Sequence, residues 1–135
     1  MALILPVFIS LMIGILDVGW ALFAYQSVGN AARLGTRYAI VHGNNWYQYA
    51  NAPQRISGAK VESYLLENGC NGGCMPGLDP TAVTVETTWQ DQITQKPGDW
   101  VQVQVSYDFH FIFLPAGIPA GSVTMSSRSR MYIYY

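Results

Sequence analysis

Charged side chains are scarce in this sequence of 135 residues, where they make up only 11% of the total. An average soluble domain carries about 25%. The net charge of −1 and the lack of any lysine or arginine cluster argue against a nucleic-acid-binding protein. The length suits one domain with a helical extension rather than two full domains. A surface with so little charge opposes close self-association only weakly.

Cysteine and histidine are also rare, which leaves little material for a metal site. The two cysteines, Cys70 and Cys74, enclose a short glycine-rich stretch, whereas His42 and His110 are isolated in the sequence. A zinc site would need a second pair of ligands, and a redox pair would need a thioredoxin-like context. We therefore favour a structural Cys70–Cys74 disulfide, which implies an oxidising, extracytoplasmic compartment.

No set of residues typical of catalysis is present. The acidic residues of the head are scattered among polar neighbours, and the serines gather in one predicted strand. The glycine-rich pieces match neither a phosphate-binding loop nor a dinucleotide fingerprint. The sequence thus predicts no catalytic residue, no metal and no cofactor, and we do not expect an enzyme.

Basic residues are missing from the start of the chain, where an ordinary secretory signal would carry them. The apolar run that begins at Met1 is also too long for such a signal and continues into a helical pattern. We expect either that the chain keeps this start as a membrane anchor or that a short basic leader was removed in front of it.

What the sequence does contain is a long N-terminal helix, predicted over residues 1–41 and about 55–60 Å long. Residues 1–24 form an apolar half suited to a membrane or a filament core, and residues 25–43 form a half suited to packing on a head. The predicted assembly residues lie in the apolar half: Leu3, Leu5, Phe8, Leu11, Ile15, Leu16 and Trp20.

The second half of this helix has two distinct faces. One is polar and carries Gln26, Asn30, Arg33 and Arg37 at helical spacing. A neighbouring face carries small residues at four-residue intervals: Ser27, Ala31, Gly35 and Ala39. Small residues let another helix approach closely, although they would equally suit packing under the chain's own sheet.

Asp17 is the only charged residue between Met1 and Ala32. A carboxylate in an apolar helix must pair, reach water or stay protonated, because burying it alone is costly. One interpretation places it in water near the membrane boundary. The other predicts an inter-subunit pair, in which Asp17 meets the N-terminal amine, Arg33 or Arg37 of a staggered neighbour.

The remainder, residues 44–135, predicts a small α+β head. A second helix is expected from Pro53 to Asn68, followed by three strands that begin near Val83, Val101 and Ser122. The strand from Val101 alternates apolar and polar side chains most clearly, so one of its faces must be buried. The second half of the long helix is the predicted cover of that face. The expected fold is therefore pilin-like, with about three antiparallel strands packed on the helix.

Three segments of the N-terminal helix resemble the TadE-like family of the tight-adherence (Tad) pilus systems. They are Ala2-Leu-Ile-Leu-Pro6, Gly14-Ile-Leu-Asp-Val-Gly19 and Asn30-Ala-Ala-Arg-Leu-Gly-Thr-Arg-Tyr-Ala39. The resemblance implies a type IV pilin-like architecture, removal of a leader by a prepilin peptidase, a pilus assembly machinery as partner, and a place in or beside an extracellular filament. Family members carry an early glutamate that this chain lacks, so Asp17 is the only acid in that zone.

These features predict a structural subunit that is anchored in the inner membrane and then assembles with copies of itself into an extracellular filament. The aromatic loop Trp46–Tyr49, the cysteine loop and the C-terminal tyrosines are candidate lateral contacts. The alternatives are a minor pseudopilin or membrane-anchored assembly protein of nearly identical sequence, and a surface adhesin that binds through the aromatics of its head.

Overall fold

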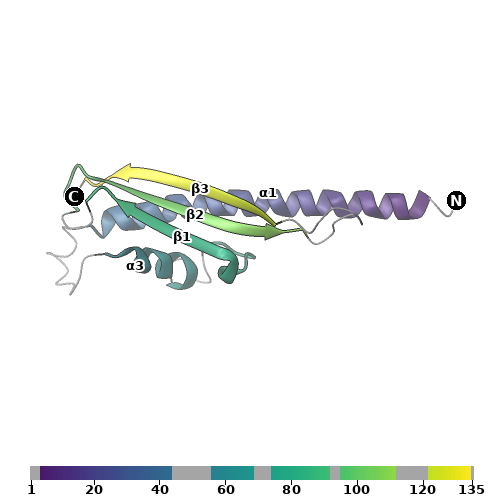
Figure 1. The fold of residues 1–135 in the computed structure, drawn as a ribbon, viewed down its shortest axis with the longest axis horizontal. Coiled ribbons are helices and arrows are strands. Elements are labelled where there is room, and N and C mark those ends of the chain that lie inside the picture. The colour runs from purple at the N-terminus through teal and green to yellow at the C-terminus, as the bar shows by residue number, and fades with distance from the viewer. Residues whose placement is uncertain (1–3, 44–55, 69–73, 92–94, 112–121, 135) are drawn as a thin grey trace.

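The computed structural model describes residues 4–43, 56–68, 74–91, 95–111 and 122–134. A long N-terminal helix, a short helical segment and a three-stranded antiparallel sheet make up this part of the chain, which confirms the predicted α+β class (Figure 1). The elements are α1 (Ile4–Val41), α3 (Gly58–Ser63), the π-helical turn η1 (Tyr64–Asn68), the 3-10 turn η2 (Pro80–Ala82), β1 (Val83–Trp89), β2 (Trp100–His110) and β3 (Ser122–Tyr132).

The sheet has the strand order β1-β2-β3, and the central strand carries most of its core. Val105 of β2 pairs with Val85 of β1, and Val103 pairs with Ser129 of β3. Apolar and polar residues alternate along β2, so one face is buried and the other is polar, as predicted. The buried positions of β2 are Val101, Val103, Val105, Tyr107 and Phe109.

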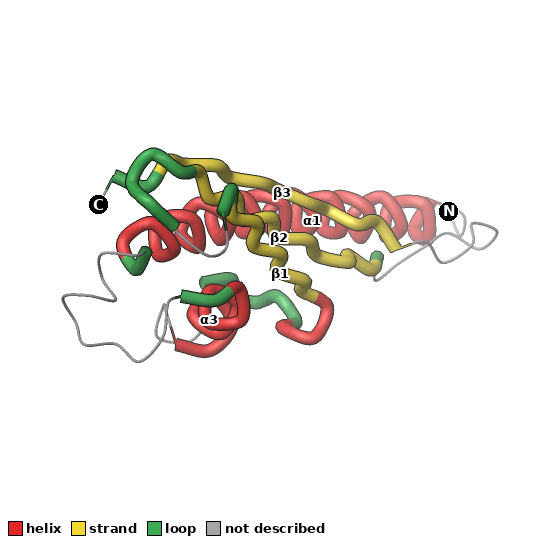
Figure 2. The backbone as a smooth tube through the Cα atoms, turned by 60° about the vertical axis from the view of Figure 1, so that its left-hand side comes forward, coloured by secondary structure: helices red, strands yellow, loops and turns green. Residues whose placement is uncertain are grey.

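The second half of α1 lies along this apolar face, as predicted, and forms the second layer of the head (Figures 1 and 2). Small side chains dominate the contact, so the helix backbone can lie close to the strands. The buried residues of this half are Ala24, Val28, Ala31, Ala32, Gly35, Thr36 and Ala39.

Gly35 shows how closely the elements approach at the centre of the core. A Cβ atom at this position would lie 2.9 Å from Cδ1 of Leu65 and 3.2 Å from Cγ1 of Val103. Ala31 and Ala39 are fully buried beside it, whereas Ser27 is half-buried. The small residues thus pack against the chain's own sheet and its own second helix. Of the two predicted uses, the structure supports packing within the head.

The second helix is shorter in the structure than in the prediction. Helix α3 begins at Gly58 and continues through η1 to Asn68, while the predicted start at Pro53 lies outside the described residues. Its apolar side was predicted correctly, because Val61 and Leu65 are fully buried. Tyr64 also stacks on Tyr38 of α1, with ring centroids 3.9 Å apart. This segment therefore closes one side of the core.

Thr36 is a fully buried polar residue of α1. Its hydroxyl donates to the Ala32 carbonyl at 2.7 Å and lies 3.3 Å from the Ser129 carbonyl of β3. Because Thr36→Val removes this donor at nearly constant volume, we expect a loss of about 1 kcal/mol in the free energy of unfolding. Thermal unfolding of the detergent-solubilised chain measures it. The exposed Thr84→Val is the control, and equal unfolding temperatures for the two variants would contradict the prediction.

Candidate assembly interface

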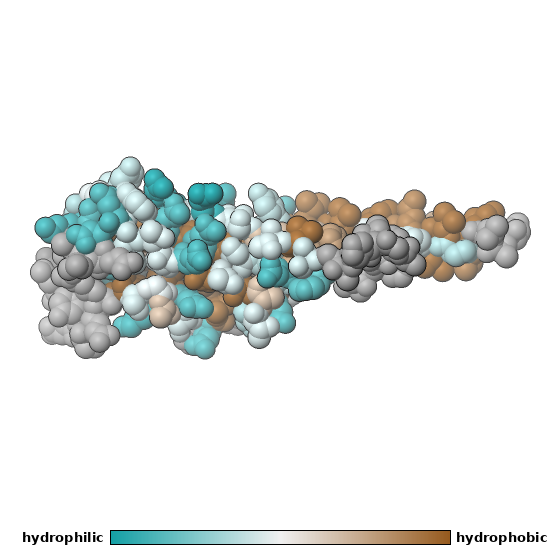
Figure 3. Space-filling view, viewed as in Figure 1, coloured by the Kyte–Doolittle hydropathy of each residue, from teal (hydrophilic) through white to brown (hydrophobic). Residues whose placement is uncertain are grey.

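The first half of α1 extends beyond the head as an apolar rod. Figure 3 shows this part as a hydrophobic protrusion beside a largely polar head. Every large apolar side chain from Ile4 to Phe23 is exposed or half-buried, and Leu16 keeps 70% of its surface exposed. A soluble monomer rarely exposes so large a continuous apolar surface, so this surface marks a region of interaction.

The length of this rod matches the thickness of a membrane. The 20 residues from Ile4 to Phe23 span about 30 Å in a helix, close to the hydrocarbon thickness of a bilayer. By length and composition α1 could cross a membrane, and only 11% of its most apolar window is buried inside the protein. The first half of α1 therefore does not serve as part of the hydrophobic core of the chain's own head.

The predicted assembly residues lie where a partner could reach them. Trp20 is 43% exposed, while the other described members keep more than half of their surface free; Leu3 lies outside the described residues. The exposed members are Leu5, Phe8, Leu11, Ile15, Leu16 and Trp20. At about 100° per residue they cover roughly half of the helix circumference, which is wide enough for contact with more than one neighbour.

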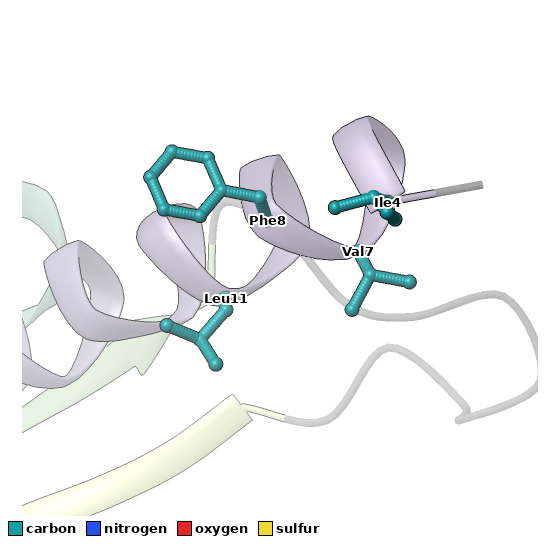
Figure 4. A pocket seen from close by; sticks show the side chains of 4 residues that line it. All are labelled: Ile4, Val7, Phe8 and Leu11. Atoms are coloured by element: carbon teal, nitrogen blue, oxygen red, sulfur yellow. The ribbon is translucent and has the colours of Figure 1, made fainter. Parts of the chain in front are cut away.

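A shallow apolar hollow marks the end of the rod. Ile4, Val7, Phe8 and Leu11 line it over two successive turns of α1, as Figure 4 shows, and its volume is about 390 Å³. Residues at this spacing share one side of a helix. The hollow is large enough to receive apolar side chains from a second helix.

Asp17 is buried in the single chain, with 7% of its surface exposed, while both of its sequence neighbours are exposed. It lies seven residues before Ala24 and eleven before Val28, and so shares the side of α1 that faces the head. Asp17 also makes an interaction within the chain. The interpretation of Asp17 as a solvated residue is therefore wrong for this structure.

Arg33 and Arg37 are exposed on the polar face of α1, as predicted. Asp17 lies 16 residues before Arg33, about 24 Å along the helix, so the two meet only between staggered copies. The inter-subunit pair stays a prediction. A neighbour's arginine would have to reach a carboxylate that the chain itself largely covers.

The head contacts the apolar half at Trp20, a feature that the sequence did not indicate. Gly77 has a φ of +79°, and a Cβ atom there would lie 3.3 Å from the Trp20 ring. Trp20 in turn packs against Phe23, with ring centroids 5.6 Å apart. The loop around Gly77 has no periodicity, so its contact with Trp20 could not be predicted from the sequence. This contact joins the head to the last turn of the rod.

The other candidate contacts are only partly described. Cys74 is buried and is not a free thiol. Cys70 lies outside the described residues, so the Cys70–Cys74 pairing stays a prediction. The loop Trp46–Tyr49 and Tyr135 also lie outside them, while Tyr132 and Tyr134 are exposed. Within the described segments, no group of three or more histidine, cysteine, aspartate or glutamate residues is placed to hold a metal ion.

The chain was compared with known protein families and structures. The model of the TadE-like protein family matches residues 1–37, which lie in the N-terminal helix, and does not extend into the strands of the head. No curated protein and no solved structure matches the chain. Residues 1–37 are thus similar to the TadE-like family, as the resemblance of the sequence predicted.

Proposed function

We propose that this protein is a structural subunit of a Tad-type, pilus-like extracellular filament, in which the apolar half of α1 packs with the same segment of other copies. The TadE-like match over residues 1–37 supports an association with Tad pili, and the apolar helix fits membrane anchoring. The observation that carries the finer proposal is the exposure of the apolar rod from Ile4 to Phe23 on one stable head.

Two environments can cover the apolar side chains of the rod. In a bilayer, lipid chains cover its apolar side chains over a matching length of about 30 Å. Outside the bilayer, only other apolar helices can do so. Each large side chain that a neighbour covers contributes about 1.5–3 kcal/mol relative to exposure in water, so a bundle of such helices holds together once it has left the membrane.

The head suits a polymer surface better than a membrane interior. The outer face of its sheet is polar, with Glu86 on β1, Gln104 on β2 and Arg128 on β3 side by side in the register. The head would therefore remain in water while the rods bundle. This division of one chain into an apolar assembly segment and a polar head is what the proposed filament requires.

Shearing the cells that make this protein tests the proposal. We expect the chain to dominate the sheared filaments and to show the predicted Cys70–Cys74 disulfide as a loss of two hydrogens from the peptide that contains both cysteines. A chain that stays in the membrane fraction and is scarce in the filaments would instead be an assembly protein. Binding of a soluble head without residues 1–24 to a surface, with no filaments formed, would favour an adhesin.

A further inference from the structure

The charged residues of the head separate onto its two opposite edges. One edge consists of β3 and the adjoining side of α1, and the other consists of β1 with α3 beside it (Figures 1 and 2). Among the described residues, the first edge carries four arginines and no carboxylate within the head. We call these residues the basic edge: Arg33, Arg37, Arg128 and Arg130.

Helical spacing places Arg33 on the β3 side of α1, with Arg37 beside it on the exposed face of the helix. A Cβ atom at Gly29 would lie 3.8 Å from the Ser127 hydroxyl, and the Thr36 hydroxyl lies 3.3 Å from the Ser129 carbonyl. Arg33 is four residues after Gly29 and three before Thr36, so it shares their side of the helix. Arg37 lies one turn further on. Both are thus level with the arginines of β3.

The opposite edge is acidic. Gly58 of α3 packs against Thr87 of β1, which brings the acidic residues of both elements to one side. We call them the acidic edge: Glu62, Glu67, Asp79 and Glu86, with Lys60 as the one cation among them. Hydrogen bonds from the hydroxyl and the amide of Thr81 hold the pKa of the Asp79 carboxyl below its ordinary value. That edge is therefore negatively charged at neutral pH.

Most side chains of the basic edge and of the acidic edge are exposed, so a partner can reach them. Arg33, Arg37 and Arg128 are exposed, as are Glu67, Asp79 and Glu86. Arg130 stacks on Trp100 at 4.5 Å and donates to Gln102, which holds its guanidinium in a defined position at the rim. The other described charges of the head belong to neither set. Asp91, Lys96 and Asp99 lie in the segment between β1 and β2, and Asp108 of β2 accepts a hydrogen bond from Thr124 of β3.

From this separation we propose that the basic edge of one head docks on the acidic edge of the next copy in the filament. The inference rests on the proposed function. Two different surfaces of one chain that complement each other form a heterologous contact, which repeats into an open polymer rather than closing as a dimer. Each exposed ion pair is weak, but the bundled rods keep neighbouring heads at high effective concentration. The charges thereby set the register and direction of packing.

A charge-exchange experiment in the full chain tests this contact. The triple variant Arg33→Glu, Arg37→Glu and Arg128→Glu gives the basic edge a net negative charge, and the double variant Glu67→Arg and Glu86→Arg gives the acidic edge a net positive charge. We expect each of these two variants to lower the yield of sheared filaments roughly tenfold, because edges of like net charge then face each other across every contact. The combined variant, whose edges again carry opposite net charges, should recover most of the yield.

The outcomes separate this inference from the proposed function. All five positions are exposed, and unfolding temperatures in detergent show whether each variant keeps its fold. Wild-type yields from the triple or the double variant, or no recovery in the combined variant, would overturn the docking of the two edges while leaving the filament itself established. An effect of the basic-edge variant alone would instead point to an anionic membrane surface. Absence of wild-type filaments would reject the proposed function.

Discussion

The Leu11→Lys variant is expected to leave no filaments on the cell, while its head unfolds at the wild-type temperature. Leu11 lies near the middle of the apolar rod, is 59% exposed in the single chain and lines the hollow beside Phe8. A lysine at the centre of a membrane helix costs about 2.5–3.5 kcal/mol. In a bundle of rods each copy would bury an unpaired ammonium group, which costs several kcal/mol more per subunit.

Two measurements make this result specific. Electron microscopy of sheared material counts filaments, and the amount of protein in the membrane fraction shows whether the variant is made and inserted. Ser126→Lys adds the same charge on the exposed face of β3, and Leu11→Met keeps the apolar surface, so both should assemble. Normal filaments from Leu11→Lys would show that the rod is not the assembly surface.

The second large effect is expected in the head, where Gly35→Leu should lower the free energy of unfolding by about 3 kcal/mol or more. A Cβ atom alone would already lie 2.9 Å from Leu65 Cδ1 and 3.2 Å from Val103 Cγ1. Leu65 and Val103 are fully buried, so they cannot move into solvent to make room for three further carbon atoms. Replacing a helical glycine restores at most about 1 kcal/mol of helix propensity.

Thermal unfolding in detergent measures this loss, which corresponds to roughly 10–20 °C in the unfolding temperature. Gly19→Leu is the matched control, because a Cβ built at Gly19 meets no atom of another described element within 4 Å. Its unfolding temperature should equal or slightly exceed that of the wild type. Similar behaviour of the two variants would mean that the close approach at Gly35 does not limit packing in the head.

Local patterns were sufficient to predict the elements of this fold and the main surface proposed for its function. The apolar run that starts at Met1 predicted one long helix, and the structure describes α1 from Ile4 to Val41. Alternation from Val101 onward predicted β2 and the face that it buries, because side chains of a strand point in turn to opposite sides. The long apolar half also predicted a segment suited to a membrane or a filament core, and in the structure its large side chains are mostly exposed.

Only the tertiary structure decided how those elements use their faces. A stripe of small residues suits a neighbouring helix of another copy or the chain's own core, and the contacts of Gly35 with Leu65 and Val103 select the core. The sequence likewise did not decide the surroundings of Asp17. In the structure it lies on the side of α1 that faces the head, and only 7% of its surface is exposed. The basic and acidic edges join residues that are nearly a hundred positions apart, such as Arg33 and Arg128. Periodicity reports which residues share a face of one element, while the pairing of faces depends on long-range packing that no single segment encodes.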